Sequence, residues 1–225
     1  RHGVILAHKG ERRGNLDVSR TLWSMELLPL TFASGWASGV NAYATVLVLG
    51  LLGRFADTGG IPEGFQRTDV LIVMAILTLV EFVADKIPYV DSAWDTISTV
   101  VRPIAGALIG ALIAGASGDL LTISLAAVGG VTALLSHLTK AGIRLAVNTS
   151  PEPVSNIGAS LIGDVGVVGI TTLATVAPML AAGIVAVVMV AGFIVLWFAV
   201  SRIRRGWRAF RRWFRRTTAE PTRTA

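Results

Sequence analysis

An uncharged run of 36 residues, Val165–Val200, restricts the fold of this chain more than any other feature. A transmembrane helix needs about 20 largely apolar residues, so the run is long enough for two of them. Pro178 lies inside the run and predicts the turn between the two helices. Only 15% of the 225 residues are charged, whereas soluble domains carry about 25%. We therefore expect a helical protein that crosses a membrane several times.

Six apolar segments approach the length of a membrane span. In chain order they are Leu27–Gly53, Val70–Ile87, Pro103–Gly118, Leu120–Val147, Ile157–Ala177 and Met179–Val200. The fold class that they predict is all-α, a polytopic helical membrane protein of about six spans. The third segment is short, so it either spans the membrane fully or enters it as a re-entrant element.

Two polar loops between these segments are expected to be ordered. Ser92 can cap a short helix, which the Arg102-Pro103 pair separates from the third span. The two prolines in Asn148–Pro153 exclude a continuous helix there. Each loop either forms a short interfacial helix, which is the preferred interpretation, or dips into the bilayer. Residues 70–118 and 120–177 also share a layout, which is a weak internal repeat of the kind that transporters contain.

Charge at the two ends of the chain indicates the domain boundaries and the orientation. Residues 1–24 hold five Lys or Arg and two acids, and residues 202–225 form a basic tail with nine Arg and one Glu. The first stretch is expected as a cytosolic tail, or as an upstream extension if translation starts at Met25. Residues 25–201 between them form the transmembrane domain. Because cytoplasmic loops are enriched in Lys and Arg, an even number of spans would place both termini in the cytoplasm.

Polar side chains gather on one face of four predicted spans, at the spacing of a helix. A polar group that faces hydrocarbon costs several kcal/mol, so four such faces predict a shared polar interior. Eight of these side chains are candidate ion-coupling or substrate-binding groups. They are Asn41, Glu81, Asp85, His137, Lys140, Arg144, Asn148 and Asp164.

Glu81 and Asp164 are the carboxylates that we expect deepest in the membrane. Glu81 follows Asp69 by twelve residues, which is about 18 Å at the helical rise of 1.5 Å. This depth is past the middle of a hydrocarbon core about 30 Å thick. Burial favours the neutral form of a carboxyl group, so both acids are candidates for coupling to a proton or another cation.

The basic groups near these carboxylates leave two interpretations open. In the first, they form a cytoplasmic vestibule for an anionic solute or a phospholipid-like headgroup. In the second, the acids of the second span and the bases of the fourth form an ion-pair cluster that only fixes the helix register. His137 alone is more often a packing or hydrogen-bonding residue than a ligand. The vestibule residues would be Lys86, Arg102, Lys140 and Arg144.

The C-terminal tail predicts an amphipathic helix on the membrane surface. Aromatic side chains recur there at helical spacing, and arginines fill the remaining surface. Such a helix places its aromatic side chains in the interface and its arginines among anionic phospholipid headgroups. The tail begins next to a span, so we expect the lipid bilayer as its partner and no nucleic acid. The residues are Arg204, Arg205, Trp207, Arg208, Phe210, Arg211, Arg212, Trp213 and Phe214.

Enzyme signatures are not found in the sequence. The chain has no Cys and contains no zinc-binding His-Glu-x-x-His motif, Walker loop or Gly-x-Ser-x-Gly motif. We therefore expect no catalytic residues, no metal and no cofactor, with an intramembrane lipid-modifying enzyme as the minor alternative. The predicted function is a small transporter or permease for a small-molecule or ion substrate. The second interpretation is a non-catalytic scaffold that recruits partners or anionic lipid, and a homo-oligomer is compatible with both.

Three strings within the predicted membrane domain resemble a known family. They are residues 34–43 (SGWASGVNAY), residues 81–88 with 91–95 (EFVADKIP and DSAWD), and residues 140–144 with 148–153 (KAGIR and NTSPEP). Together they look like an uncharacterised bacterial family of integral-membrane proteins, domain of unknown function 4126, over about residues 25–200. The resemblance implies a location in the bacterial cytoplasmic membrane. It implies no activity, so no functional residue is carried over from it.

Overall fold

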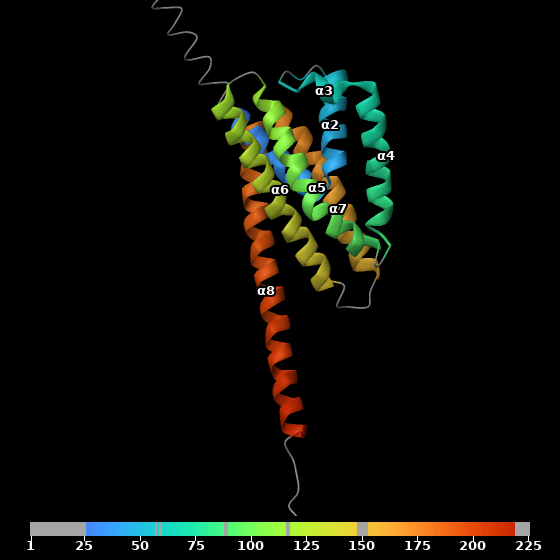
Figure 1. Ribbon diagram of the computed structural model, residues 1–225, viewed down its shortest axis with the longest axis vertical. Helices are drawn as coiled ribbons and strands as arrows, with labels where there is room; N and C mark the ends of the chain where they lie inside the picture. The colour runs from blue at the N-terminus through green and yellow to red at the C-terminus, as the bar shows by residue number, and fades with distance from the viewer. Residues whose placement is uncertain are drawn as a thin grey trace, which may run out of the picture.

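The computed structural model describes residues 26–56, 58, 60–87, 90–115, 118–147 and 153–218, which form a bundle of helices (Figure 1). A helix over residues 26–40 is followed by α2 (Ala42–Phe55), α3 (Glu63–Gln66), α4 (Thr68–Ala84), α5 (Val90–Ala114), α6 (Asp119–Val147), α7 (Pro153–Val176) and α8 (Pro178–Thr218). The predicted all-α fold class is confirmed, and α8 starts at Pro178 as expected. The predictions for residues 1–24 and for Asn148 lie outside the described residues.

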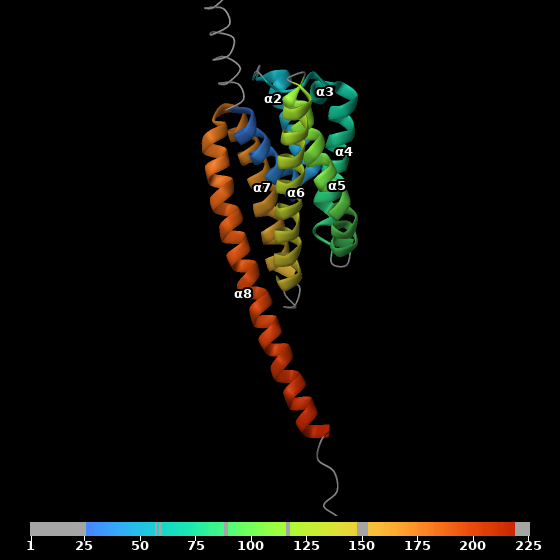
Figure 2. The same ribbon diagram turned by 60° about the vertical axis from the view of Figure 1, so that its left-hand side comes forward.

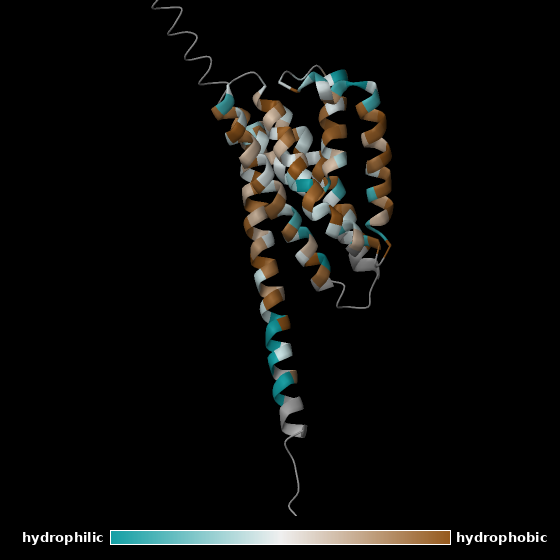
Figure 3. Cartoon of the chain, in the orientation of Figure 1, coloured by the Kyte–Doolittle hydropathy of each residue, from teal (hydrophilic) through white to brown (hydrophobic). Residues whose placement is uncertain are grey.

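Several helices are suited to a lipid environment. Three stretches are long and apolar enough to cross a membrane, namely Ala93–Ala114, Asp119–Leu145 and Pro178–Arg212. Most residues along the helices of the bundle are apolar (Figure 3). On α4, for example, Ile72, Ile76 and Leu79 are each more than half exposed. Apolar surface of this extent is stable against lipid and not against water, so the fold indicates a membrane protein.

The structure corrects the expected helix boundary at Arg102-Pro103. α5 is one helix of 25 residues with Pro103 inside it, so the short helix expected after Ser92 and the short third span are a single element. α5 packs tightly on α6, because a Cβ atom at Gly106 would lie 2.5 Å from the carbonyl oxygen of Gly129. Small residues let two helix backbones approach closely, and this contact supports α5 where Pro103 cannot donate a backbone hydrogen bond.

The segment expected to be the first span turns back on itself. The helix of residues 26–40 runs into the bundle and α2 returns toward the same end (Figure 2), so that Leu27 and Leu52 pack in one hydrophobic cluster. We call residues 26–55 the re-entrant hairpin and Gly39–Asn41 its tip. Asn41 is extended, with φ −154° and ψ 103°, and its side-chain oxygen caps α2 by accepting from the Ala44 N–H at 2.9 Å. The predicted first span is therefore wrong.

Two glycines place the re-entrant hairpin directly on α6. A Cβ atom at Gly35 would lie 2.8 Å from the carbonyl oxygen of Gly129, and one at Gly39 would lie 2.2 Å from that of Ala133. Side chains at these positions would push the hairpin away from α6, since a packed core has no room for added atoms. Backbone contact therefore fixes how deeply the hairpin tip sits in the bundle.

Helices α4 to α8 run in alternating directions, so residues 26 and 218 lie at opposite ends of the molecule (Figures 1 and 2). This differs from the prediction that both ends lie on one side of the membrane. That prediction counts the first segment as a crossing, and the re-entrant hairpin removes this crossing.

α8 extends far beyond the bundle (Figure 1). It contains 41 residues, which is about 61 Å at 1.5 Å per residue and twice the thickness of a hydrocarbon core of about 30 Å. Its basic end is helical, as predicted, but it continues the axis of α8 instead of turning to lie across it. The side chains of Trp213 and Phe214 lie outside the described ones. The exposed predicted residues are Arg204, Arg205, Trp207, Arg208, Phe210, Arg211 and Arg212.

Candidate functional site

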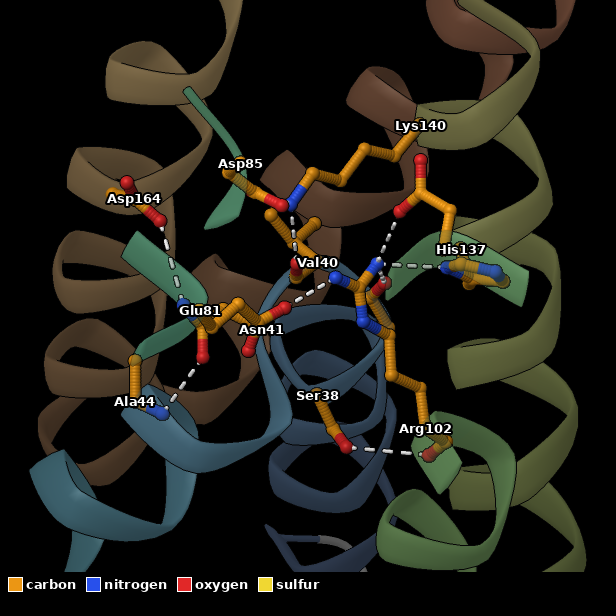
Figure 4. Close-up of polar contacts among 12 residues, drawn as sticks. Ser38, Val40, Asn41, Ala44, Glu81, Asp85, Arg102, His137, Lys140 and Asp164 are labelled. Carbon is orange, nitrogen blue, oxygen red and sulfur yellow. Dashed lines mark hydrogen bonds and ion pairs between the residues drawn. The ribbon is translucent and has the colours of Figure 1, made fainter. Parts of the chain in front are cut away.

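Six charged side chains meet beside the hairpin tip, and we call them the charge cluster. Figure 4 labels Glu81, Asp85, Arg102 and Lys140 among them. They are Glu81 and Asp85 from the end of α4, Asp95 and Arg102 from α5, and Lys140 and Arg144 from α6. The three acids and three bases named here balance one another, and Asp91, a further buried acid of α5, also acts electrostatically on Arg144. Charge balance is needed here, because taking an ion out of water costs several kcal/mol unless a partner compensates it.

One half of the charge cluster is built around Arg102. Its Nη2 donates to Glu81 Oε1, and its Nη1 lies 3.2 Å from Gly39 O and 2.7 Å from His137 Nδ1. Arginine only donates hydrogen bonds, so His137 Nδ1 is the acceptor. The ring proton then lies on Nε2, which is 3.0 Å from the Thr99 hydroxyl. His137 is therefore a hydrogen-bonding residue that positions Arg102.

The other half of the charge cluster joins Asp85 to two bases of α6. Lys140 Nζ lies 2.8 Å from Asp85 Oδ2, and the terminal nitrogens of Arg144 lie 3.0 and 3.2 Å from the two Asp85 oxygens. Arg144 also contacts Asp95 of α5 at 3.0 Å. The charge cluster thus connects the end of α4 with α5 and α6 in one network.

The hairpin tip supplies two backbone acceptors to this network. The last carbonyl groups of a helix have no partner within it. Gly39 O accepts from Arg102, and Val40 O accepts from Lys140 at 2.8 Å. Cations at this position also suit the negative end of the helix dipole. Two parallel chains of contacts result, each from carboxylate to cation to carbonyl: Glu81, Arg102 and Gly39 in one, and Asp85, Lys140 and Val40 in the other.

Asp164 of α7 lies beside the hairpin tip but outside the charge cluster. Its Oδ1 is 3.5 Å from Asn41 Nδ2, and its Oδ2 is 4.0 Å from Lys86 Nζ. The side chains of Lys86 and Asp164 are 21% and 19% exposed, whereas those of Arg102 and Glu81 are each 1% exposed. The Asp164–Lys86 pair is therefore more exposed than the Arg102–Glu81 pair.

The structure brings most of the predicted site residues together at the hairpin tip. The Asp164 side chain is 19% exposed, so it is less enclosed by the bundle than Glu81. The expected vestibule is not open at Arg102, Lys140 and Arg144, because each of these bases pairs with a carboxylate. In the described part of the chain, no group of three or more potential ligands is arranged to hold a metal ion. The predicted residues at the tip are Asn41, Glu81, Asp85, His137, Lys140 and Arg144.

Sequence reasoning includes Arg102 among the vestibule bases but misses Asp95 and the pairing of Arg102 with Glu81. A continuous helix places residues at i, i+4, i+7 and i+11 on one face. The polar residues of α5 follow this spacing up to the proline, and this is the signal that identifies them. They are Asp91, Asp95, Ser98 and Arg102, and all four are buried.

A bundle of apolar helices with a re-entrant hairpin and buried, balanced charges defines an integral membrane protein. The chain belongs to the family described as Domain of unknown function (DUF4126), which it matches over residues 28–198. Neither a curated protein nor a solved structure matches the chain. The family resemblance found in the sequence is confirmed. The matched region includes the hairpin tip and the charge cluster, and it ends before the basic end of α8.

Proposed function

We propose that this protein is a small transporter or permease that moves an anionic solute or lipid headgroup together with a proton or another cation. The observation that carries the proposal is the hairpin tip, whose carbonyl groups end among the buried charges of α5 and α6. Irregular backbone at membrane depth occurs only where it is buried in protein or lines a cavity. Many transporters build their binding sites from such interrupted helices.

A purely structural role explains the charge cluster less well. Replacing a buried ion pair by apolar residues of similar volume is often neutral or stabilising, so six buried charges are an inefficient way to hold helices together. Ionisable residues within membrane segments usually mark the path of an ion or substrate. Both considerations favour a binding role for the charge cluster.

The pairing of Glu81 with Arg102 suggests how a proton and an anion are coupled. A proton on Glu81 removes its negative charge and leaves Arg102 with only the more distant carboxylate of Asp95, whose Oδ1 lies 3.9 Å from Arg102 Nη1. An anion that binds Arg102 then returns the charge cluster to a formal charge of zero. Binding either ion alone leaves a net charge in a buried site, which is unfavourable. Proton and anion are therefore expected to bind together.

We place the protein in the bacterial cytoplasmic membrane, with the basic end of α8 in the cytoplasm, because Lys and Arg are enriched on that side. The opposite end of the bundle carries more acids than bases among its described residues. In this orientation the re-entrant hairpin enters from the external side. The charged residues at that end are Glu26, Glu63, Asp69 and Asp119 against Arg54 and Arg67.

The test is proton movement into proteoliposomes that contain the full chain and a trapped pH dye. Inward gradients of phosphate, sulfate and succinate serve as probe anions. At least one of them is expected to acidify the lumen with wild-type protein, and Glu81→Gln is expected to abolish this, because an amide cannot exchange the proton. Asp69→Asn is the matched control, since it makes the same change on an exposed carboxylate of α4. Equal rates for wild type and Glu81→Gln would reject the proposal.

A membrane scaffold is the second candidate, and the projecting end of α8 favours it. This end exposes six arginines between residues 202 and 212 beyond the helical bundle, where they can contact anionic lipid or an acidic partner. Deleting residues 202–225 distinguishes the candidates. The scaffold loses its function with the bundle intact, whereas the transporter retains its proton and anion flux.

A further inference from the structure

We infer that Arg102 and Lys140 form a binding subsite for an oxyanion, such as a phosphate or carboxylate group, and that the hairpin tip occupies this subsite in the closed protein. The inference deepens the proposed function. It rests on that function only for the claim that the bound anion is carried across the membrane.

Each of the two cations has one partner that an oxyanion can replace. Besides a carboxylate, Arg102 contacts Gly39 O at 3.2 Å and Lys140 contacts Val40 O at 2.8 Å. A helix end carries a partial charge of only about −0.5, and hydrogen bonds to an ionised acceptor are roughly twice as strong as those between neutral groups. An oxyanion with two oxygens is therefore a stronger partner for the two cations than two consecutive carbonyl groups.

Arg102 and Glu81 also keep unused hydrogen-bonding capacity. Arg102 Nε and Glu81 Oε2 are buried and have no hydrogen-bond partner. A buried polar atom without a partner costs about 1–3 kcal/mol, so such an atom calls for an explanation such as a ligand, a water or a proton. The guanidinium fork matches the geometry of an oxyanion, and a proton on Glu81 Oε2 would leave more of this fork free to bind.

The hairpin tip packs on α6 through Gly39 and in an apolar cluster through Val40, and its shortest polar contacts to other helices are the two that the oxyanion would replace. Its other polar contacts are long: Asn41 Nδ2 lies 3.5 Å from Asp164 Oδ1, and Ser38 Oγ lies 3.4 Å from Arg102 O. Protein hydrogen bonds are usually about 2.9 Å long, so these contacts are weak. An oxyanion that takes over the two cations therefore removes the strongest polar contacts of the tip and favours its release.

Cysteine labelling measures the release of the tip. The chain has no Cys, so Val40→Cys is a unique reporter at a position that is 6% exposed. The full-length protein in detergent is labelled with a maleimide, with phosphate as the probe and choline chloride at equal ionic strength as the comparison. Phosphate is expected to accelerate labelling roughly fivefold or more in a saturable manner, because a ligand shifts a conformational equilibrium by its differential affinity.

Two variants show whether the acceleration reports the proposed subsite. Lys140→Met in the Val40→Cys background removes one cation and is expected to abolish the effect of phosphate. Ala174→Cys is the matched reporter, since it is 1% exposed on α7 and does not touch the tip. Its labelling rate is expected to be the same with and without phosphate. A rise at this position too would show general loosening and would overturn the inference.

A disulfide that locks the tip supplies a second test that leaves both cations in place. A Cβ atom at Gly163 would lie 3.3 Å from Val40 Cγ1, which is suitable for a Val40→Cys/Gly163→Cys disulfide. Phosphate is expected to raise the Tm of the wild type and of the reduced variant, and not that of the oxidised variant. The control Ala107→Cys/Gly130→Cys joins α5 to α6, where the two Cβ atoms would be 3.2 Å apart, so a small separation of the helices forms the disulfide. This variant is expected to keep the phosphate response when oxidised.

Lipid nanodiscs distinguish a free anion from a lipid headgroup. A free anion accelerates Val40→Cys labelling in phosphatidylcholine alone, whereas a headgroup ligand accelerates it when phosphatidylglycerol is included without phosphate. Labelling that responds to neither overturns the inference, even if proteoliposomes move protons and anions. Labelling that responds while proteoliposomes move nothing supports the subsite and rejects the transport function.

Discussion

Two arginine–carboxylate pairs in this protein have the same chemistry and opposite surroundings. Arg67 and Asp69 lie 2.7 Å apart at the start of α4, with side chains 67% and 63% exposed. Arg102 and Glu81 are each 1% exposed, and Arg102 also contacts the hairpin tip and His137 of α6. Surface pairs are weakened by water and salt, whereas a buried charge depends fully on its partner. The burial of an ion pair therefore decides how much its loss changes the stability of the protein.

Removing one member of the buried pair is expected to have the largest effect on stability. Arg102→Met leaves the Glu81 carboxylate buried without a base, which lowers the free energy of unfolding by about 3–5 kcal/mol. The double variant Glu81→Gln/Arg102→Met is expected to recover most of this loss, because no buried charge remains unpaired. Unfolding in mixed detergent and SDS micelles measures both. A double variant as unstable as Arg102→Met would show that packing, and not charge, dominates.

Adding a methyl group at the hairpin tip extends the comparison to backbone contacts. Gly39→Ala forces the tip away from the Ala133 carbonyl group, which lies 2.2 Å from the new Cβ position, and overpacking of this kind destabilises by about 1–3 kcal/mol. Gly169→Ala on α7 meets no atom within 4 Å, and it is expected to stabilise the helix by about 0.5–1 kcal/mol. The same micelle unfolding assay compares them, and a loss at both positions would contradict the expectation.

The cap of α2 has a smaller expected effect. Asn41→Ala removes the acceptor for the Ala44 N–H, and the loss of an N-cap costs about 1 kcal/mol. Asn41→Ser retains the cap but shortens the side chain that reaches Asp164, so it is expected to restore stability without restoring that contact. Thermal unfolding of the three proteins measures the cap. Equal destabilisation by Ala and Ser would assign the effect to the Asp164 contact instead.

Breaking the exposed pair is expected to have the smallest effect. Arg67→Gln removes an ion pair that lies on the surface, where solvent and salt already weaken the attraction. The unfolding midpoint of this variant is expected to equal that of the wild type within error at moderate ionic strength. A clear destabilisation that persists in high salt would show that exposure to solvent does not make the Arg67–Asp69 pair the weaker contributor to stability.

Much of the candidate site can be predicted from the sequence, because helical spacing is a local property. It identifies Glu81 with Asp85 and Lys140 with Arg144 as polar faces, and the structure joins these faces. The continuity of α5 through Pro103 is not predictable in the same way. Pro103 favours a helix boundary locally, whereas the packing of α5 on α6 keeps the helix continuous.

Apolar length and the spacing of polar side chains were sufficient to establish a helical membrane protein with a polar interior. The reversal of the chain at Asn41 and the pairing of each charge were decided by the tertiary structure. Asn41 predicts a helix start equally well in a kinked span and in a hairpin. The hairpin packs on the backbone of α6 through Gly35 and Gly39, and that contact depends on residues almost one hundred positions away.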